Sequence, residues 1–350
     1  MLSLGGAKQR SNPGGFWCND RILFTFCVSP DKILIMNDGD LFILIVSILA
    51  AAIRSGTPVL FATVGEIFTE KSGVLNLGLE GMILTGAVSG YAVNHYTGSL
   101  LLGVIAGVLA GGLISLIHAF LTVTLRANQV VSGIALTIFG TGLSGLFGKN
   151  LVGISTKGFT PIAIPVLSKI PVIGNILFNQ DILIYLSYVL IPLCYFYIFK
   201  TRPGLYMRSA GENPRTADSL GINVSLVRYL YIFTGGLLCG LGGVYLSLAY
   251  TPMWVQDMSA GRGWIAIALV IFATWNPVKA AAGAYLFGGV DALQLRIQAT
   301  GIANIPAPLL KMLPYIFTIL VLLIATKGAA RKRIGAPAAL GIPYVREERG

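Results

Sequence analysis

The side chains in this sequence that could do chemistry are few, and most of them lie inside long apolar runs. Glu80 follows Asn76 by four residues and Gln294 follows Asp291 by three, so each pair would share one face of a helix. An acidic group inside a membrane normally faces protein or water, which makes it a functional candidate. The alternative for Glu80 is a packing role, in which it pairs with a basic residue such as Arg54.

These groups suit a path for a polar solute better than a catalytic centre. A solute with hydroxyls or ring nitrogens needs hydrogen-bond donors and acceptors, and Trp264 could stack on a ring or simply sit at the membrane interface. Two histidines and four cysteines without metal-ligand spacing predict no metal site. The run GLFGKN lacks the spacing of a phosphate loop, so no ATP site is expected. The candidate translocation-path residues are Asn76, Glu80, Asn128, Gln129, Trp264, Asn276, Asp291 and Gln294.

The elements that must position these residues are membrane helices. The chain has 350 residues, of which 55% are hydrophobic and only 11% are charged, whereas soluble domains carry roughly 25% charged residues. A mean hydropathy of +0.78 excludes a soluble enzyme of this length. The net charge of +11 is spread over a few loops and the tail, which is typical of membrane orientation rather than of nucleic-acid binding. We therefore predict an all-α polytopic membrane protein.

Nine apolar runs are candidates to cross a bilayer as helices, for which about 20 residues are needed. The run 263–275 is too short for a full span and is expected to be a half-helix. Arg54 and Pro58 interrupt the first run, which predicts either one broken helix or a short hairpin. The sequence therefore predicts nine or ten transmembrane helices. The runs are 41–64, 74–96, 99–125, 129–147, 182–199, 229–250, 263–275, 278–299 and 309–326.

The distribution of Lys and Arg sets the orientation of these helices. Both residues are frequent in loop 200–228 and after residue 326, which places these segments in the cytoplasm. The first 35 residues fit no span, and Met36 is a better start, so we expect an upstream extension of the reading frame or a disordered tail there. The predicted division is an extension over 1–35, a membrane domain over 36–328 and a basic cytoplasmic tail over 329–350.

An internal repeat is also visible. The stretch 134–141 is identical to 267–274 at six of eight positions, and under the predicted topology the two copies run in opposite directions. Inverted repeats of this kind place a substrate path at their interface. Chance similarity between apolar runs is the alternative.

The longest polar stretch between the apolar runs, 200–228, contains the signature of a short helix over 214–220. Asn213 is a good N-cap, Pro214 suits the first helical position, and Gly221 can take the left-handed conformation that ends the helix. Two helical turns cannot persist alone in water, so the helix must pack against the membrane domain or another protein. Arg215 and Asp218 leave it little apolar surface for lipid, which favours a groove in a partner protein.

Three stretches resemble one group of transporters. GENPRTADSLGINV (211–224) resembles the cytoplasmic coupling segment of ABC-importer permeases in the branched-chain amino acid and simple-sugar class. GEIFTEKSGVLNLGLEGMILTGA (65–87) and GRGWIAIALVIFATWNPVKAAAGAYLFG (261–288) resemble the nucleoside and simple-sugar permeases that work with basic-membrane-protein-type lipoproteins. The resemblance covers approximately residues 40–328 and leaves out the first 35 residues.

The resemblance implies the permease subunit of an ATP-driven importer for nucleosides or related simple sugars, working by alternating access in a bacterial inner (plasma) membrane. It implies three partners: a cytoplasmic ABC ATPase that carries ATP and Mg, a second homologous permease, and an extracytoplasmic substrate-binding lipoprotein. The chain itself is then no enzyme and binds no cofactor. The alternative, an ion-coupled secondary transporter, would explain the intramembrane charges but not the capped cytoplasmic helix. The residues assigned to ATPase coupling are Gly211, Glu212, Asn213, Pro214, Arg215, Ala217, Asp218 and Gly221.

Overall fold

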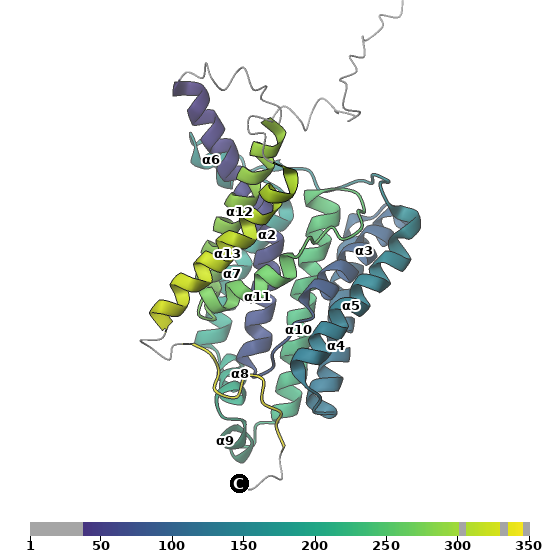
Figure 1. Ribbon diagram of the computed structural model, residues 1–350, viewed down its shortest axis with the longest axis vertical. Helices are drawn as coiled ribbons and strands as arrows, with labels where there is room; N and C mark the ends of the chain where they lie inside the picture. The colour runs from purple at the N-terminus through teal and green to yellow at the C-terminus, as the bar shows by residue number, and fades with distance from the viewer. Residues whose placement is uncertain (1–37, 301–305, 330–334, 346–350) are drawn as a thin grey trace, which may run out of the picture.

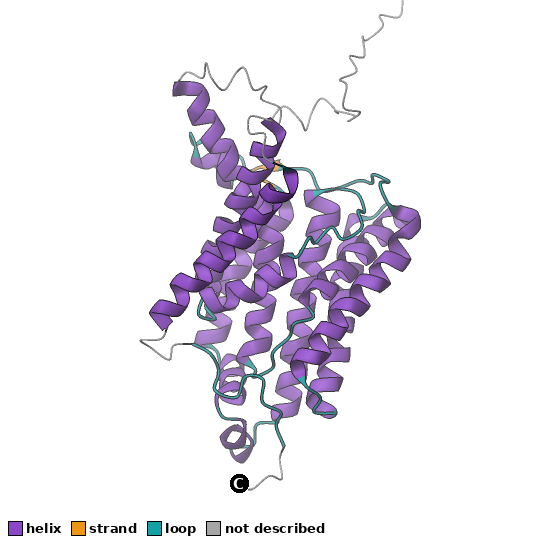
Figure 2. Ribbon diagram, viewed as in Figure 1, coloured by secondary structure: helices purple, strands orange, loops and turns teal. Residues whose placement is uncertain are grey.

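The computed structural model describes residues 38–300, 306–329 and 335–345, and the predicted extension over 1–35 lies outside the described residues. The described chain is a bundle of α-helices with one two-stranded ribbon, so the all-α expectation is confirmed (Figure 1, Figure 2). The α-helices are α2 (Asp38–Lys71), α3 (Leu79–Thr97), α4 (Leu100–Ala119), α5 (Gln129–Gly148), α6 (Ile173–Leu177), α7 (Ile182–Lys200), α8 (Arg202–Glu212), α9 (Pro214–Ser219), α10 (Val224–Tyr245), α11 (Arg262–Phe272), α12 (Pro277–Thr300) and α13 (Ala307–Ala329). The shorter elements are η2 (Phe120–Thr124), η3 (Lys149–Leu151), β1 (Ile162–Ala163), η4 (Leu167–Lys169), β2 (Asn179–Gln180) and η5 (Leu246–Tyr250).

Each of the nine predicted spans overlaps one α-helix of the described chain. Long apolar runs become helices because a helix satisfies its own backbone hydrogen bonds in lipid. Within the described residues, five helices are long and apolar enough to cross a membrane. The expected total of nine or ten transmembrane helices stays a prediction. The five are Phe42–Lys71, Leu100–Thr124, Gln129–Leu151, Ile182–Lys200 and Val224–Tyr250.

Helix α2 is the central element of the bundle and packs against α10, α11 and α12. It runs without a break from Asp38 to Lys71 with Pro58 inside it, so the expected broken helix or hairpin is wrong. Every residue from Ser55 to Val74 is buried. Neighbouring helices that surround a proline in this way compensate for its missing N–H, which allows the helix to continue.

Helices α3, α4 and α10 approach one another at glycines, which allow the backbones of membrane helices to come close together. Gly107 of α4 lies against the backbone of Gly86 in α3, and Gly111 lies against Gly236 and Gly240 of α10. A methyl group at Gly107 or Gly111 would overlap main-chain atoms of the neighbouring helix. These glycines therefore serve close helix packing.

The loops of the described chain gather at two opposite ends of the bundle. In Figure 1, α8, α9 and the C-terminal residues lie at the lower end, and α6 lies at the upper end. Helix α2 ends at the lower end, where the Lys71 ammonium group donates a hydrogen bond to the Gly335 carbonyl at 2.9 Å. The loop 200–228 and the C-terminal residues were both predicted to be cytoplasmic, and they do share one end, together with the end of α2. At the other end, β1 and β2 pair antiparallel, with Ile162 opposite Gln180.

The two copies of the internal repeat lie in α5 and in α11 with the turn after it. The helices before them, α4 and α10, pack against each other, and each ends in a π-helical turn, η2 and η5. The start of α5 lies near the end of α2, because Gln129 Oε1 accepts a hydrogen bond from the Leu75 N–H. The turn after α11 lies there too, because Trp275 Nε1 donates to Glu70. The copies therefore run in opposite directions as expected, and the inverted repeat itself stays a prediction.

Candidate functional site

The predicted coupling helix is present as α9. Asn213 caps its first turn through Oδ1, which accepts a hydrogen bond from the Thr216 N–H at 3.0 Å. Pro214 occupies the first helical position, and Gly221 follows the helix with φ +84°. The helix ends at Ser219, one residue earlier than predicted. The cap, the first residue and the terminating glycine are as expected, because all three are local backbone requirements.

A second helix, α8, precedes α9, and the sequence reasoning missed it. Its N-cap is Thr201, whose hydroxyl accepts a hydrogen bond from the Gly204 N–H, and Pro203 lies in its first turn. Both residues are helix-start signals that are visible in the sequence. Met207 and Ala210 are its buried residues with side chains. Helices α8 and α9 together form a folded segment rather than a loop with one helix.

One side of α9 is buried and the other is exposed. Ala217 is 1% exposed and packs with Ala210 and Val224. Arg215 is exposed, and Leu220, directly after the helix, is 75% exposed. The exposed arginine and leucine favour contact with a partner groove, because a helix this short needs external contacts.

The other predicted coupling residues lie at the edges of this surface. Gly211 and Glu212 end α8, and both accept hydrogen bonds from the C-terminal residues. Asp218 is half-buried and lines a cavity of about 270 Å³ together with Arg126 of the α4–α5 connection. Arg215 and Asp218 are therefore not equally exposed, although both were expected to face a partner.

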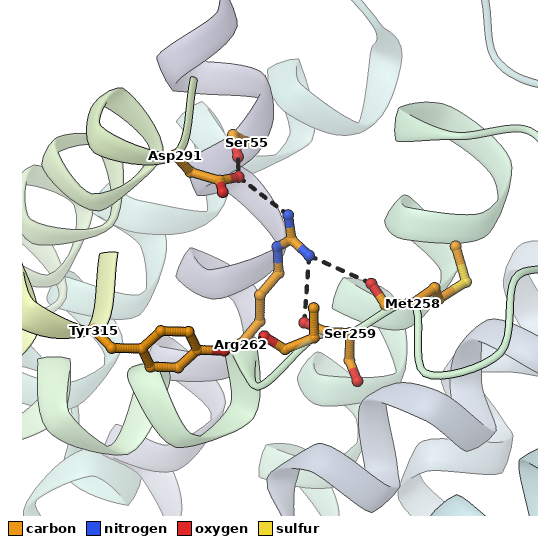
Figure 3. Close-up of polar contacts among 7 residues, drawn as sticks. Ser55, Met258, Ser259, Arg262, Asp291 and Tyr315 are labelled. Carbon is orange, nitrogen blue, oxygen red and sulfur yellow. Dashed lines mark hydrogen bonds and ion pairs between the residues drawn. The ribbon is translucent and has the colours of Figure 1, made fainter. Parts of the chain in front are cut away.

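A polar cluster surrounds the start of the short helix α11 (Figure 3). Arg262, the first residue of α11, forms an ion pair with Asp291 of α12, with 3.2 Å between Nη2 and Oδ2. The same carboxylate oxygen accepts a hydrogen bond from the Ser55 hydroxyl of α2. The two charged side chains are only 12% and 13% exposed, so each depends on the other to offset its lost hydration. The cluster therefore ties α2, α11 and α12 together.

The Arg262 guanidinium makes further contacts within this turn. Its Nη1 donates to the carbonyls of Met258 and Ser259, both at 3.3 Å. Its Cζ lies 5.7 Å from the centre of the Tyr250 ring, a distance suited to a cation–π interaction. Among the described residues, no acceptor contacts its buried Nε. The guanidinium thus keeps a free donor inside the protein.

Glu80 caps the start of α11 from the side of α3. Its Oε1 accepts hydrogen bonds from the Ser259 hydroxyl at 2.5 Å and from the Gly261 N–H at 2.8 Å. Its Oε2 accepts one from the Gly263 N–H at 2.7 Å. A carboxylate suits this place because the first N–H groups of a helix have no partner within the helix and carry partial positive charge.

Glu80 does not pair with Arg54, the basic partner that was the example for its packing role. Arg54 instead donates from Nε to Gln180 Oε1 at 2.8 Å and from Nη2 to the Asn179 carbonyl. The partners of Glu80 are mostly backbone N–H groups about 180 residues away. Sequence reasoning that looked only for a side-chain cation could not find them.

The turn before α11 has an unusual backbone. Asp257 and Ala260 have φ values of +53° and +46°, a conformation that costs a residue other than glycine about 1–3 kcal/mol. Gly261 follows with φ +78°. The Tyr315 hydroxyl of α13 donates a hydrogen bond to the Ala260 carbonyl at 2.5 Å and helps to hold the turn. Such strain, held by surrounding contacts, is typical of functional sites.

Three predicted path residues have local backbone roles. Asn76 lies before α3, so it does not share a helical face with Glu80 as expected; its Oδ1 accepts a hydrogen bond from the Gly78 N–H. Asn128 is the N-cap of α5. Asn276 Oδ1 accepts from the Val278 N–H at the start of α12. These asparagines fit the rule that Asn bonds to nearby backbone at helix starts.

The remaining predicted path residues are spread along the bundle. Gln129 is buried at the start of α5, where its Oε1 is 2.7 Å from the Leu75 nitrogen. Gln294 lies one turn after Asp291 in α12 and is 4% exposed. Trp264 is 43% exposed. Of the predicted set, Glu80 and Asp291 therefore contact the start of α11, and Trp264 lies in its first turn but is exposed.

The residue that organises this cluster, Arg262, was not predicted. Its signal was present, because it is a single basic residue at the start of a run too short to span a bilayer. Ser55, Ser259 and Tyr315 carry no such signal, because serine and tyrosine occur throughout this sequence, in helices and turns alike. Within the described residues, no group of three or more His, Cys, Asp or Glu side chains is arranged to hold a metal ion.

Residues 48–325 match the family model described as the permease component of branched-chain amino acid transport systems. The chain belongs to this permease family. A putative glucose ABC transporter permease of Haloferax volcanii is 40% identical over 86% of this permease and 98% of its own length. A nucleoside ABC transporter permease of Lactococcus lactis is 37% identical and a guanosine ABC transporter permease of Bacillus subtilis 34% identical, each over 86% of this permease and 97% of the relative. No solved structure matches this permease.

The family resemblance seen in the three sequence stretches is thus confirmed. The chain is a multi-pass membrane protein and the permease subunit of an ABC transporter. Its two structured regions of interest are the α8–α9 segment at one end of the bundle and the polar cluster at the start of α11.

Proposed function

We propose that this permease imports nucleosides or related simple sugars, driven by ATP hydrolysis on a separate ATPase. The solute class is supported by relatives whose names give glucose, nucleosides and guanosine. The family description names branched-chain amino acids instead. The relatives match nearly their whole length to this chain, so they are the better guide to the solute.

The observation that carries the ATP-driven part is the geometry of α9. A six-residue helix is capped by Asn213, ended by Gly221, and presents Arg215 and Leu220 to solvent. A rigid, partly apolar projection of this kind suits docking into a groove of a cytoplasmic ATPase. An ion-coupled transporter needs no such projection. In this proposal ATP and Mg bind to the ATPase, and this chain supplies only the docking helix.

The polar cluster at α11 is the proposed part of the translocation path in this chain. Helix α11 is a half-helix, and its first turn is held by contacts that a movement of α3, α12 or α13 would break. Asp291 can accept hydrogen bonds from solute hydroxyls, and the Arg262 Nε can donate one. Alternating access would then reposition α11 relative to these neighbours, at the interface of the two proposed inverted repeats.

The proposed assembly contains a second homologous permease and an extracytoplasmic substrate-binding lipoprotein. The lipoprotein would meet the end of the bundle that carries the β1–β2 ribbon, opposite α9. The membrane domain of the proposal spans 36–328 with nine or ten transmembrane helices, and 329–350 form its cytoplasmic tail. The capped segment Gly211–Gly221 makes the contact with the ATPase.

Uptake into proteoliposomes that hold the permease with its ATPase and binding protein tests this function. We expect accumulation of a labelled purine nucleoside or a labelled hexose that requires internal ATP, stops with vanadate and survives a protonophore. Uptake driven by an ion gradient without the ATPase would overturn the ATP-driven mechanism. Competition only by branched-chain amino acids would overturn the proposed solute class.

A further inference from the structure

The C-terminal residues Gly335–Val345, called the strap below, lie across the same end of the bundle as α8 and α9. In Figure 1 the strap is the yellow irregular segment that passes beside the α8 label. The sequence reasoning treated it only as part of a basic tail. Pro337 and Ala339 are buried, however, so the strap is a packed element of the fold.

On one side the strap is bound to the coupling segment. The Ala339 N–H donates a hydrogen bond to the Gly211 carbonyl at 2.9 Å, and the Ala338 N–H donates to Glu212 Oε2 at 3.2 Å. Tyr344 packs against the apolar cluster that buries the inner side of α9. The members of that cluster are Ala210, Ala217 and Val224, with Ile222 and Val227 beside them.

On the other side the strap is bound to the membrane helices. Its first residue, Gly335, accepts a hydrogen bond from the Lys71 ammonium group at the end of α2, at 2.9 Å. Gly335 has φ +113° and lies so close to the Trp275 ring that an added Cβ would be 3.0 Å from it. Leu340 packs against the main apolar core, and the Ile342 carbonyl accepts a hydrogen bond from Arg228 of α10.

Trp275 links the strap to α11. It follows the last turn of α11, and its Nε1 donates a hydrogen bond to Glu70 of α2 at 2.5 Å. The opposite end of α11 begins with Arg262, the centre of the polar cluster. An α-helix of this length is a rigid rod of about 16 Å. A movement of Trp275 that carried α11 with it would therefore displace Arg262.

We propose that the strap transmits the movement of α9 to the foot of α11 and so to the polar cluster. The proposal rests on the proposed docking function of α9. The main helix contacts of α9 are with α8 and α10. The strap adds a direct connection from α9 to α2 and to the α11–α12 turn. In this proposal its residues are positioning residues, because they act through their contacts with Gly211, Lys71 and Trp275.

Truncation of the chain before Gly335 is the first test, with truncation after Val345 as the matched control. In the reconstituted complex we expect the shorter chain to keep bound ATPase but to lose both uptake and the stimulation of ATP hydrolysis by substrate-loaded binding protein. The control should behave as the full chain does. Full stimulation without the strap would overturn the proposal.

Two point variants keep the test decisive if the truncated chain does not insert. Tyr344→Ala removes the side chain that covers α9, and Ala339→Pro removes the N–H that binds Gly211. Both should lose the stimulation of ATP hydrolysis while basal hydrolysis and ATPase binding stay normal. Tyr206→Ala is the control, because Tyr206 is a tyrosine at the same end that is 45% exposed. Loss of ATPase binding in the strap variants would overturn transmission and indicate a docking role instead.

Variants of α9 separate this inference from the proposed function. Leu220→Asp should lose ATPase binding itself, whereas strap variants should keep it. Normal binding and coupling in Leu220→Asp would overturn the docking function of α9. Normal coupling in the strap variants, together with lost binding in Leu220→Asp, would overturn the strap alone.

Discussion

Replacing Glu80 by glutamine should destabilise the permease at the start of α11. The carboxylate accepts hydrogen bonds from the Ser259 hydroxyl and from the N–H groups of Gly261 and Gly263, at 2.5, 2.8 and 2.7 Å. Glutamine keeps one acceptor oxygen, so at least one of these buried donors loses its partner. An unsatisfied buried donor costs about 1–3 kcal/mol, and the remaining bonds lose the strengthening of a charged acceptor. We expect the free energy of unfolding to fall by about 2–4 kcal/mol.

The assay is thermal unfolding of the detergent-purified permease, followed by intrinsic fluorescence. Asp257→Asn is the matched control, because Asp257 is an exposed acid in the same turn and asparagine tolerates its φ of +53°. We expect a clearly lower unfolding midpoint for Glu80→Gln and an unchanged midpoint for Asp257→Asn. If both variants unfold with the wild-type midpoint, Glu80 does not stabilise α11 and the reasoning is refuted.

Three further substitutions give expectations at other places. Gly221→Val puts a β-branched residue at φ +84°, which costs about 1–3 kcal/mol, so substrate-stimulated ATP hydrolysis should fall. Gly221→Asn should keep this stimulation, because asparagine tolerates the left-handed conformation. Equal activity of the two variants would contradict the strain argument. Asp291→Asn leaves Arg262 without its anionic partner at a cost of about 3–5 kcal/mol. The thermal stability of Asp291→Asn should therefore fall. The Arg262→Met/Asp291→Leu double variant should recover this stability but not uptake. Recovered uptake would exclude the Arg262–Asp291 pair from the translocation path. Labelling with an impermeant thiol reagent, in a background without native cysteines, tests the orientation. A cysteine at Ser219 should react only in inside-out vesicles, and a cysteine at Thr160 should react only in intact cells. The reverse pattern would mean that the predicted orientation is inverted.

Features that depend on neighbouring residues in the sequence could be predicted. The helices follow from apolar runs, because lipid leaves the backbone no other partner than itself. Helix α9 follows from Asn213, Pro214 and Gly221, whose effects act within one or two turns. Helix α8 has similar signals in Thr201 and Pro203, but its surface lacks a long apolar stripe, so it was missed.

Features that depend on distant backbone groups could not be predicted. Glu80 binds main-chain N–H groups of Gly261 and Gly263, and these have no side-chain signature. The strap binds Gly211 and Lys71 through its own main chain, and these contacts have no side-chain signature. Its composition did carry a signal, because 335–345 contain no charged residue, but the basic residues on either side hid it. Continuous packing around Pro58 is likewise a property of the neighbouring helices and not of α2 alone.

The central claim is that this permease is driven by an ATPase that docks on α9. ATP hydrolysis by the reconstituted complex, measured with and without substrate-loaded binding protein, tests it most directly in wild type and in Leu220→Asp. Leu220 is 75% exposed, so its replacement should leave the membrane domain folded. The account predicts strong stimulation in wild type and none in Leu220→Asp, with equal amounts of permease in the vesicles. Equal stimulation in both proteins would contradict it.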